Sequence, residues 1–264
     1  MDLDLTGRTA LVSGSTAGIG LATAKGLAAQ GARVVVNGRT AERVEAARAS
    51  ILAEYPQAAI EVAAFDLSTG EGVSHVVAAH PNVDILVNSL GIFEPKPFAD
   101  ISDAEWFRFF ETNVMSGVRL SRAYLPHMIA NNWGRIIFVS SESALNIPAE
   151  MVHYGVTKAA QLAVSRGIAE TVAGTNITVN SVLPGPTKSE GVRTFIAQIA
   201  SSQSISAGEA EKLFFRDVRP TSLLKRFASV DEVANMIVYL SSPAASATTG
   251  SSVRVDGGVV KTIA

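Results

Sequence analysis

The chain has 264 residues, 47% of them hydrophobic and 17% charged, and its formal net charge of −2 leaves no concentrated basic face for nucleic acid. No apolar run approaches the roughly 20 residues that span a bilayer, no secretory signal opens the chain, and there is no cysteine for disulfides or thiolate chemistry. The four histidines show no metal-ligand spacing, so we expect a cytoplasmic protein with no metal, no membrane partner and no nucleic-acid partner.

Short β-branched runs alternate with longer Ala- and Leu-rich stretches, which indicates parallel strands joined by helices. The pattern predicts, in chain order, strand 8–12, helix 18–30, strand 33–37, helix 42–54, strands 60–65 and 83–88, a long helical region over 103–128, strand 135–140, helix 154–172, strand 177–182, helix 231–240 and strand 251–255. The strands are apolar on both faces, as in a sheet covered on both sides. We predict an α/β fold in which residues 1–264 form one domain, a doubly wound Rossmann-type parallel sheet of about seven strands with helices on both faces.

A glycine-rich turn follows the first predicted strand and opens the first predicted helix. It runs Ser13-Gly14-Ser15-Thr16-Ala17-Gly18-Ile19-Gly20. Glycines let the backbone turn sharply and approach a pyrophosphate, and the helix N-terminus offers free N–H groups to that anion. The spacing G-x3-G-x-G differs from the G-x-G-x-x-G of other dinucleotide enzymes, and a tight turn packed with small residues would also explain it.

The end of the second predicted strand bears on cofactor choice. Gly38 and Arg39 stand where an acidic residue would bind the ribose 2′-hydroxyl of NAD, and an arginine can accommodate the extra phosphate of NADP. A solvated arginine at the start of the next helix is the alternative. The sequence favours NADP(H) and leaves NAD(H) open.

Tyr154 and Lys158 lie four residues apart in a predicted helix and share one face. A nearby ammonium lowers the pKa of a tyrosine, which suits acid–base catalysis, although packing and solvation are the commoner explanation of such a pair standing alone. Ser141 follows the strand at 135–140, at the edge where open α/β sheets bind ligands, and could hydrogen-bond a carbonyl oxygen or cap its loop. Asn113 is a polar residue that interrupts a helical stretch. A surface position or a helix irregularity would explain it equally well.

Taken in order, these motifs resemble the short-chain dehydrogenase/reductase family over essentially the whole chain. The set comprises the turn Gly14–Gly20, Asp66-Leu67, Asn88-Ser89-Leu90-Gly91, Asn113, Ser141, Tyr154 with Lys158, and Pro184-Gly185. Each motif is ordinary, and the ordered set is specific. The family usually carries a second Asn and an Ala in place of Ser89 and Leu90, so we expect Leu90 to reshape the wall beside the cofactor.

The resemblance implies a role for each residue. Tyr154 would be the general acid/base and Ser141 would polarise the substrate oxygen. Lys158 would lower the pKa of Tyr154 and hold the nicotinamide ribose, and Asn113 would support a proton-relay water. The cofactor-binding residues, from the resemblance and the arguments above, are Gly14, Ser15, Thr16, Gly18, Ile19, Gly20, Gly38, Arg39, Asp66, Leu67, Asn88, Gly91, Tyr154, Lys158, Pro184, Gly185, Thr187 and Ser189.

The function implied is the NADP(H)-dependent interconversion of an alcohol and a ketone or aldehyde, in a homo-oligomer, most simply a tetramer. A 3-oxoacyl carrier-protein reductase and a non-catalytic NADP(H) sensor are the alternatives, and the complete catalytic set argues against the sensor. Residues 186–222 break the strand–helix alternation, hold no predicted strand and carry two short predicted helices, 192–201 and 209–218. We expect a lid over the substrate there, with a plain packing insertion as the alternative. The other expected walls, 92–96, 143–147 and 151, are mainly apolar with no obvious arginine for a carboxylate, which favours a neutral substrate.

Overall fold

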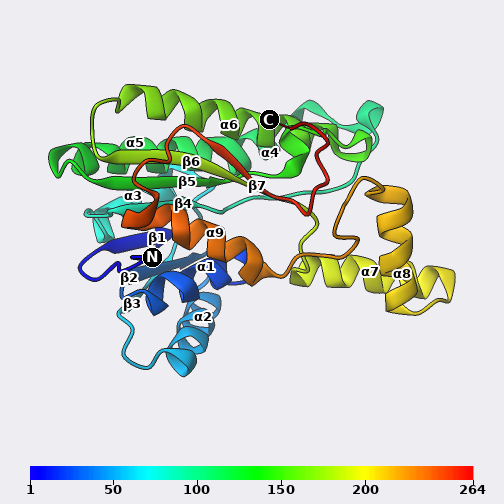
Figure 1. Ribbon diagram of the computed structural model, residues 1–264, viewed down its shortest axis with the longest axis horizontal. Coiled ribbons are helices and arrows are strands. Elements are labelled where there is room, and N and C mark those ends of the chain that lie inside the picture. Colours follow the sequence, from blue (N-terminus) through cyan, green and yellow to red (C-terminus); the bar gives the residue numbers. More distant parts are fainter. Residues whose placement is uncertain (264) are drawn as a thin grey trace.

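Seven strands form one parallel sheet in a computed structural model that describes residues 1–263, apart from the side chains at positions 190, 191, 195 and 199 (Figure 1). The strands are β1 (Thr9–Val12), β2 (Arg33–Gly38), β3 (Ile60–Ala64), β4 (Ile85–Asn88), β5 (Gly134–Val139), β6 (Ile177–Pro184) and β7 (Ser252–Val255). Their order across the sheet is β3-β2-β1-β4-β5-β6-β7, so the direction of winding reverses between β1 and β4. The predicted fold class is confirmed, and each predicted strand is present within two residues of its expected bounds.

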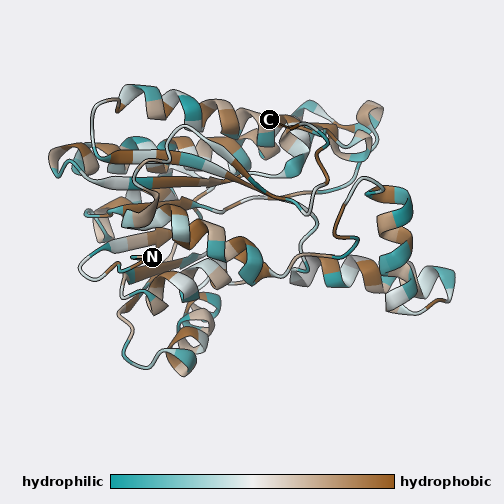
Figure 2. Ribbon diagram, in the orientation of Figure 1, coloured by the Kyte–Doolittle hydropathy of each residue, from teal (hydrophilic) through white to brown (hydrophobic). Residues whose placement is uncertain are grey.

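Helices cover both faces of the sheet. On one face lie α1 (Gly18–Ala29), α2 (Ala41–Glu54) and α9 (Val230–Ser241), and on the other α3 (Gly70–Ala79), α5 (Ser116–Ala130) and α6 (Val152–Thr171). Successive strand residues alternate between the two layers: Ala10 and Val12 pack with the first set, and Leu11 packs with the second. Both faces of the sheet are therefore apolar, and most of the central strands are brown in Figure 2.

The helical region expected over 103–128 consists of three segments. It begins with α4 (Asp103–Phe110), whose start is fixed by a capping box between Ser102 and Glu105. A π-helical turn, Glu111–Met115, then leads into α5. Asn113 lies in this turn and is buried, so the helix irregularity expected there is confirmed and the surface position is wrong.

The segment after β6 leaves the sheet and forms α7 (Glu190–Gln203), α8 (Ala207–Leu213) and a π-helical turn, Phe214–Val218. Figure 1 shows α7 and α8 standing beside the sheet rather than on it. Their apolar side chains form a cluster separate from the two main layers, made of Ile196, Ala200, Ala210, Phe215 and Phe227. Both helices expected in this segment are present.

The two ends of this segment are joined by backbone hydrogen bonds. The N–H of Ala228 donates to the carbonyl of Pro186 at 2.9 Å, and the N–H of Lys188 donates to the carbonyl of Ala228 at 2.8 Å. The segment therefore enters and leaves the domain at one place. Short 3-10 turns at Phe98–Asp100, Glu142–Ala144, Ala149–Met151 and Pro243–Ala245 complete the described elements. None of the helices within residues 1–263 is long and apolar enough to cross a bilayer.

Candidate active site

The ends of β1 and β4 lie side by side where the strand order reverses, which is the place where open α/β sheets bind ligands. Ser13 joins these ends, because its Oγ accepts hydrogen bonds from the N–H groups of Ser89 at 2.9 Å and Leu90 at 3.0 Å. Gly14 then turns the chain with φ +63°, and a Cβ at this position would lie 3.2 Å from the Cα of Leu90. The turn therefore requires glycine at position 14, with Leu90 packed against it.

The N-terminus of α1 is free to bind an anion. Its N-cap residue, Ala17, supplies no side-chain hydrogen bond, whereas α2, α4, α7 and α9 are each capped by a Ser or Thr side chain. A Cβ on Gly20 would lie 2.5 Å from the carbonyl oxygen of Gly14, so the backbone packs too closely there for any other residue. Unpaired N–H groups beside a glycine turn fit the pyrophosphate of a dinucleotide.

Asn37, which the sequence motifs do not single out, ties this turn to the neighbouring strands. Its Oδ1 accepts from the N–H of Gly14 at 3.1 Å, and its Nδ2 donates to the carbonyls of Ala63 at 2.9 Å and Phe65 at 3.0 Å. Ser15, expected to bind the cofactor, is buried with its hydroxyl bonded inside the turn. The available signal for Asn37 was a polar residue in an otherwise apolar strand.

The two residues expected to select the cofactor differ in access. Arg39 is exposed and makes no hydrogen bond or ion pair with the described residues. Gly38 is half-buried, and a Cβ there would lie 2.4 Å from Cγ2 of Thr16 and 3.1 Å from Cγ1 of Val44. Thr16 thus occupies the space that an acidic side chain at position 38 would need.

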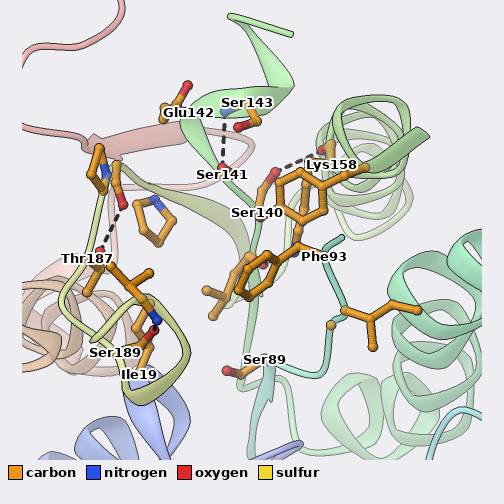
Figure 3. A pocket seen from close by; sticks show the side chains of 18 of the residues that line it. Ile19, Ser89, Phe93, Ser140, Ser141, Glu142, Ser143, Lys158, Thr187 and Ser189 are labelled. Carbon is orange, nitrogen blue, oxygen red and sulfur yellow. Dashed lines mark hydrogen bonds between the residues drawn. The ribbon is translucent and has the colours of Figure 1, made fainter. Parts of the chain in front are cut away.

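A cavity of about 320 Å³ opens between the glycine turn, the end of β5 and the start of α6 (Figure 3). The predicted residues that line it are Gly14, Ile19, Gly20, Gly91, Ser141, Tyr154, Lys158, Pro184, Gly185, Thr187 and Ser189. Thr16 and Gly18 line a second cavity, which shares Ser189 with the first. The predicted residues outside both cavities are Ser15, Gly38, Arg39, Asp66, Leu67, Asn88 and Asn113.

Three of the residues outside both cavities have side chains that contact other parts of the protein. Leu67 is fully buried in the core, so only its backbone could contact a ligand. The amide of Asn88 donates to Oγ of Ser121 at 3.3 Å, on the α5 side. One carboxylate oxygen of Asp66 accepts from both the N–H and the hydroxyl of Ser68. Their cofactor roles stay predictions.

Ser141 and Tyr154 face the cavity from different elements. Oγ of Ser141 accepts from the N–H of Ser143 at 3.1 Å, so it does cap its loop, and its hydroxyl also lies within reach of the Tyr154 phenol. Tyr154 lies in the first turn of α6, with its ring edge-on to Phe93 and 6.3 Å between ring centres. Burial raises the pKa of Tyr154 to about 12, and the hydrogen bond of Ser141 acts in the opposite direction. Burial is the largest effect, so the pKa is raised, and the lowering expected from Lys158 stays a prediction.

Lys158 holds a buried ammonium group 5.6 Å from the centre of the Tyr154 ring. Its Nζ donates to the carbonyl of Val139 at 2.9 Å and to Oε1 of Gln161 at 3.3 Å. Gln161 in turn donates from Nε2 to the main-chain carbonyl of Asn113 at 2.5 Å. Burial lowers the pKa of Lys158 to about 8. Gln161 is therefore part of the site, although no sequence motif named it.

The side chain of Asn113 is occupied by structural bonds. Its Oδ1 accepts from the N–H of Ile92 at 2.8 Å, and its Nδ2 donates to the carbonyl of Ile92 and to Oγ1 of Thr157, both at 3.0 Å. These bonds hold the chain after β4 against α6. The proton-relay water expected at Asn113 stays a prediction, with Gln161 already bonded to the Asn113 carbonyl.

One end of the cavity carries an ion pair that the sequence did not predict. Nε of Arg219 donates to Oε1 of Glu142 at 2.9 Å, and Nη1 of Arg219 donates to Oε1 of Glu150 at 3.4 Å. Glu142 and Arg219 line the cavity together with Tyr154. The sequence showed no obvious arginine for a carboxylate; Arg219 does line the cavity, and it is paired there with two carboxylates. Among the expected walls, positions 92, 93, 143 and 151 line the cavity, and positions 94–96 and 144–147 do not.

Comparisons with known proteins place this architecture in a family. The model of the short chain dehydrogenases matches residues 8–199. The chain belongs to the short chain dehydrogenase family. Its relatives include the uncharacterized oxidoreductase YvaG of Bacillus subtilis (strain 168), 48% identical over the full length of both chains. Another is the 3-oxoacyl-[acyl-carrier-protein] reductase FabG of Aquifex aeolicus (strain VF5), 32% identical over 98% of this chain and all of the relative.

A solved structure from the same family is very similar. L-sorbose reductase from Gluconobacter frateurii, complexed with NADPH and L-sorbose, superposes with a TM-score of 0.94 at 32% identity, and the match covers the whole of both chains. As a short chain dehydrogenase, this protein is an oxidoreductase that acts on CH–OH and C=O groups.

Proposed function

We propose that this short chain dehydrogenase interconverts an alcohol and a ketone or aldehyde with NADP(H), using Tyr154 as the general acid and base. The observation that carries the proposal is that Ser141, Tyr154 and Lys158 line one cavity with the glycine turn. The nicotinamide would supply or accept the hydride, and the protein would orient the reactants and handle the proton.

At neutral pH the phenol of Tyr154 is in the protonated form that reduction of a carbonyl would need. With a pKa of about 12 the phenol is protonated, so its O–H can give a proton to the carbonyl oxygen as the alcohol O–H forms. The hydroxyl of Ser141 would donate a hydrogen bond to the same oxygen and polarise the carbonyl. In the oxidising direction Tyr154 must first lose its proton, which becomes easier as the pH rises toward its pKa.

The cofactor assignment rests on the end of β2. Arg39 is exposed and without a partner among the described residues, and a guanidinium bonds well to a phosphate. Thr16 fills the place where an acidic residue at position 38 would bind the 2′-hydroxyl of NAD. NADPH is the cofactor named for the similar L-sorbose reductase, which supports the same choice here.

A second candidate is the reduction of a 3-oxoacyl group on a carrier protein. The similarity to the Aquifex aeolicus reductase favours it. A 3-oxoacyl thioester of a short carrier mimic, included in the carbonyl panel below, distinguishes the two candidates by the ratio of their kcat/KM values.

Replacing Tyr154 tests the proposal. Tyr154→Phe removes one oxygen and keeps the ring, so we expect NADPH to bind as to the wild type while carbonyl reduction falls about 100- to 10,000-fold. Turnover is followed by NADPH absorbance against a carbonyl panel, and binding by NADPH fluorescence. Tyr239→Phe, in α9 and outside the cavity, is the matched control. Near-normal turnover by Tyr154→Phe would remove Tyr154 from the mechanism.

A further inference from the structure

The cavity of the proposed active site ends in a polar cluster beyond Ser141. Figure 3 shows Glu142 on this side, away from Ile19 and Ser89. Arg219 reaches the cluster from the end of the segment that carries α7 and α8. The paired side chains of Arg219 and Glu142 are only 11% and 4% exposed. This charged pair therefore lies inside the wall of the cavity, one residue from the serine that would polarise the substrate.

Each member of the pair keeps an unused hydrogen-bonding group. Oε2 of Glu142 is buried and accepts no hydrogen bond from the described residues. Arg219 spends Nε on Glu142, and Nη1 on Glu150 and its own backbone, while its Nη2 makes no bond to residues 1–263. A buried carboxylate oxygen without a donor is costly, so a ligand that supplies one is favoured. One hydroxyl group meets both needs, because its hydrogen can be donated to Glu142 while its oxygen accepts from Arg219.

The charges at this end of the cavity disfavour an anionic substrate. A single guanidinium faces two carboxylates, Glu142 at 2.9 Å and Glu150 at 3.4 Å. Burial raises the pKa of Glu142, the ion pair with Arg219 acts against it, and the nearby Asp256 acts in the same direction as burial. Even when Glu142 is protonated, Glu150 still balances Arg219, so no net positive charge is left for a carboxylate. A neutral substrate with hydroxyl groups meets no such penalty.

We propose that Glu142 and Arg219 form a subsite for a substrate hydroxyl close to the reacting carbon, and that the substrate is a neutral hydroxylated carbonyl compound, such as a ketose, or the corresponding polyol. This inference rests on the proposed function and names its substrate class. L-sorbose, the ligand named in the similar L-sorbose reductase structure, is a compound of this class.

Two ketones of almost equal size test the subsite. Hydroxyacetone carries a hydroxyl where butan-2-one carries a methyl group, and pyruvate is the anionic comparison. With NADPH, the wild type should reduce hydroxyacetone with a kcat/KM at least about tenfold above that for butan-2-one and for pyruvate, since a hydrogen bond to a charged group is worth that much. Equal efficiency with butan-2-one, or efficient reduction of pyruvate, would overturn the subsite and leave the reductase. Reduction of none of the three would remove both.

Substitutions separate the subsite from the greater intrinsic reactivity of a hydroxyketone. Glu142→Leu and Arg219→Met each remove one hydrogen-bonding partner at similar volume, and each should lower the ratio of the two kcat/KM values by about tenfold. Arg226→Met, which breaks the exposed pair with Glu232 outside the cavity, should leave the ratio unchanged. A ratio that survives both cavity variants contradicts the proposal. If one variant fails to bind NADPH or to fold, the ratio measured with the other variant decides.

Discussion

The ammonium of Lys158 is buried, so its charge depends on the few acceptors around it. Gln161 is one of them, and its orientation is fixed because its Nε2 is bonded to the carbonyl of Asn113, which leaves Oε1 for the lysine. An acceptor stabilises the charged form of a lysine and so raises its pKa. Gln161 thus acts on the reaction through Lys158, as a positioning residue.

Two variants of Gln161 should move the pH profile in opposite directions. Gln161→Leu removes the acceptor, so the pKa of Lys158, already lowered to about 8, should fall further. The loss of activity that accompanies rising pH should then begin at a lower pH. Gln161→Glu places a carboxylate beside the ammonium, which raises the pKa and moves the same loss to higher pH. The measurement is kcat against pH from 6 to about 10 with NADPH saturating. Unchanged profiles in both variants, with the folds intact, would show that Gln161 only packs.

Cofactor preference should depend on two positions together. Arg39→Ala removes charge-assisted bonds to the 2′-phosphate, so the NADPH preference over NADH, which we expect to be about 10- to 150-fold, should largely disappear. Gly38→Asp alone should weaken both cofactors, because its Cβ would lie 2.4 Å from Cγ2 of Thr16. Thr16→Ala with Gly38→Asp removes that clash and should favour NADH. Fluorescence titration of both cofactors measures these changes. Tighter NADH binding by the unmodified protein would contradict the assignment.

Local patterns identify some of these residues and hide others. Tyr154 and Lys158 are one helical turn apart, and the glycine turn is contiguous, so spacing alone suggests their chemistry. Gln161 could have been noticed because it lies three residues after Lys158, on the same face of the predicted helix. The contact between Arg219 and Glu142 could not, because 77 residues separate them and no repeating pattern connects the 186–222 segment to the 3-10 turn that follows β5.

At the scale of elements, α7 and α8 form a unit with its own small core. Phe215 and Phe227 pack edge to face with ring centres 5.0 Å apart, and both belong to the cluster that is separate from the main layers. Little apolar area therefore joins these helices to the sheet. The predicted role of 186–222 as a lid remains a proposal, and the separate core supports it because such a unit can move without disturbing the rest.

Phe215→Ala should loosen the lid without unfolding the domain. Removing a buried Phe costs about 3–5 kcal/mol, but here the loss falls on the local cluster. Hydrogen exchange should therefore accelerate across 190–218 and the KM for the carbonyl should rise, while the main thermal transition moves little. Phe138→Ala, in β5 and buried in the main core, is the comparison and should lower the main transition. A large drop of the main transition in Phe215→Ala would show that the segment folds with the sheet.

One helix was missed because its sequence has a weak helical pattern and tertiary contacts hold it in place. The sequence did not predict α3, whose ten residues include Gly70 and Gly72. A Cβ on Gly72 would lie 2.0 Å from the carbonyl of Asp66, so glycine is needed where the helix meets the turn after β3. Thr69, which caps α3 by accepting from the N–H of Gly72, was the signal available in the sequence. The π-helical turn at Asn113 has no sequence signal of its own beyond the polar interruption.

For the whole molecule, exposed apolar side chains bear on whether copies of the chain associate. Phe107 in α4 is 74% exposed and Phe110 is 42% exposed, while Val156 in α6 is 41% exposed. Side chains of this kind on the two long helical regions support the expected homo-oligomer, most simply a tetramer. Light scattering coupled to size exclusion at micromolar concentration should give the mass of four chains. Phe107→Glu should reduce that mass, and the mass of one chain for the unmodified protein would contradict the prediction.

The joined ends of the α7–α8 segment have a consequence for the history and the engineering of this protein. Because Pro186 and Lys188 are both hydrogen-bonded to Ala228, the two ends of the segment between them lie side by side. Such a segment can be lengthened, shortened or exchanged while the strand ends that hold the glycine turn keep their register. Arg219 lies within this segment, whereas Tyr154 and the glycine turn lie outside it. Exchange of this one segment can therefore change substrate preference between relatives, while the residues proposed for hydride transfer stay in place.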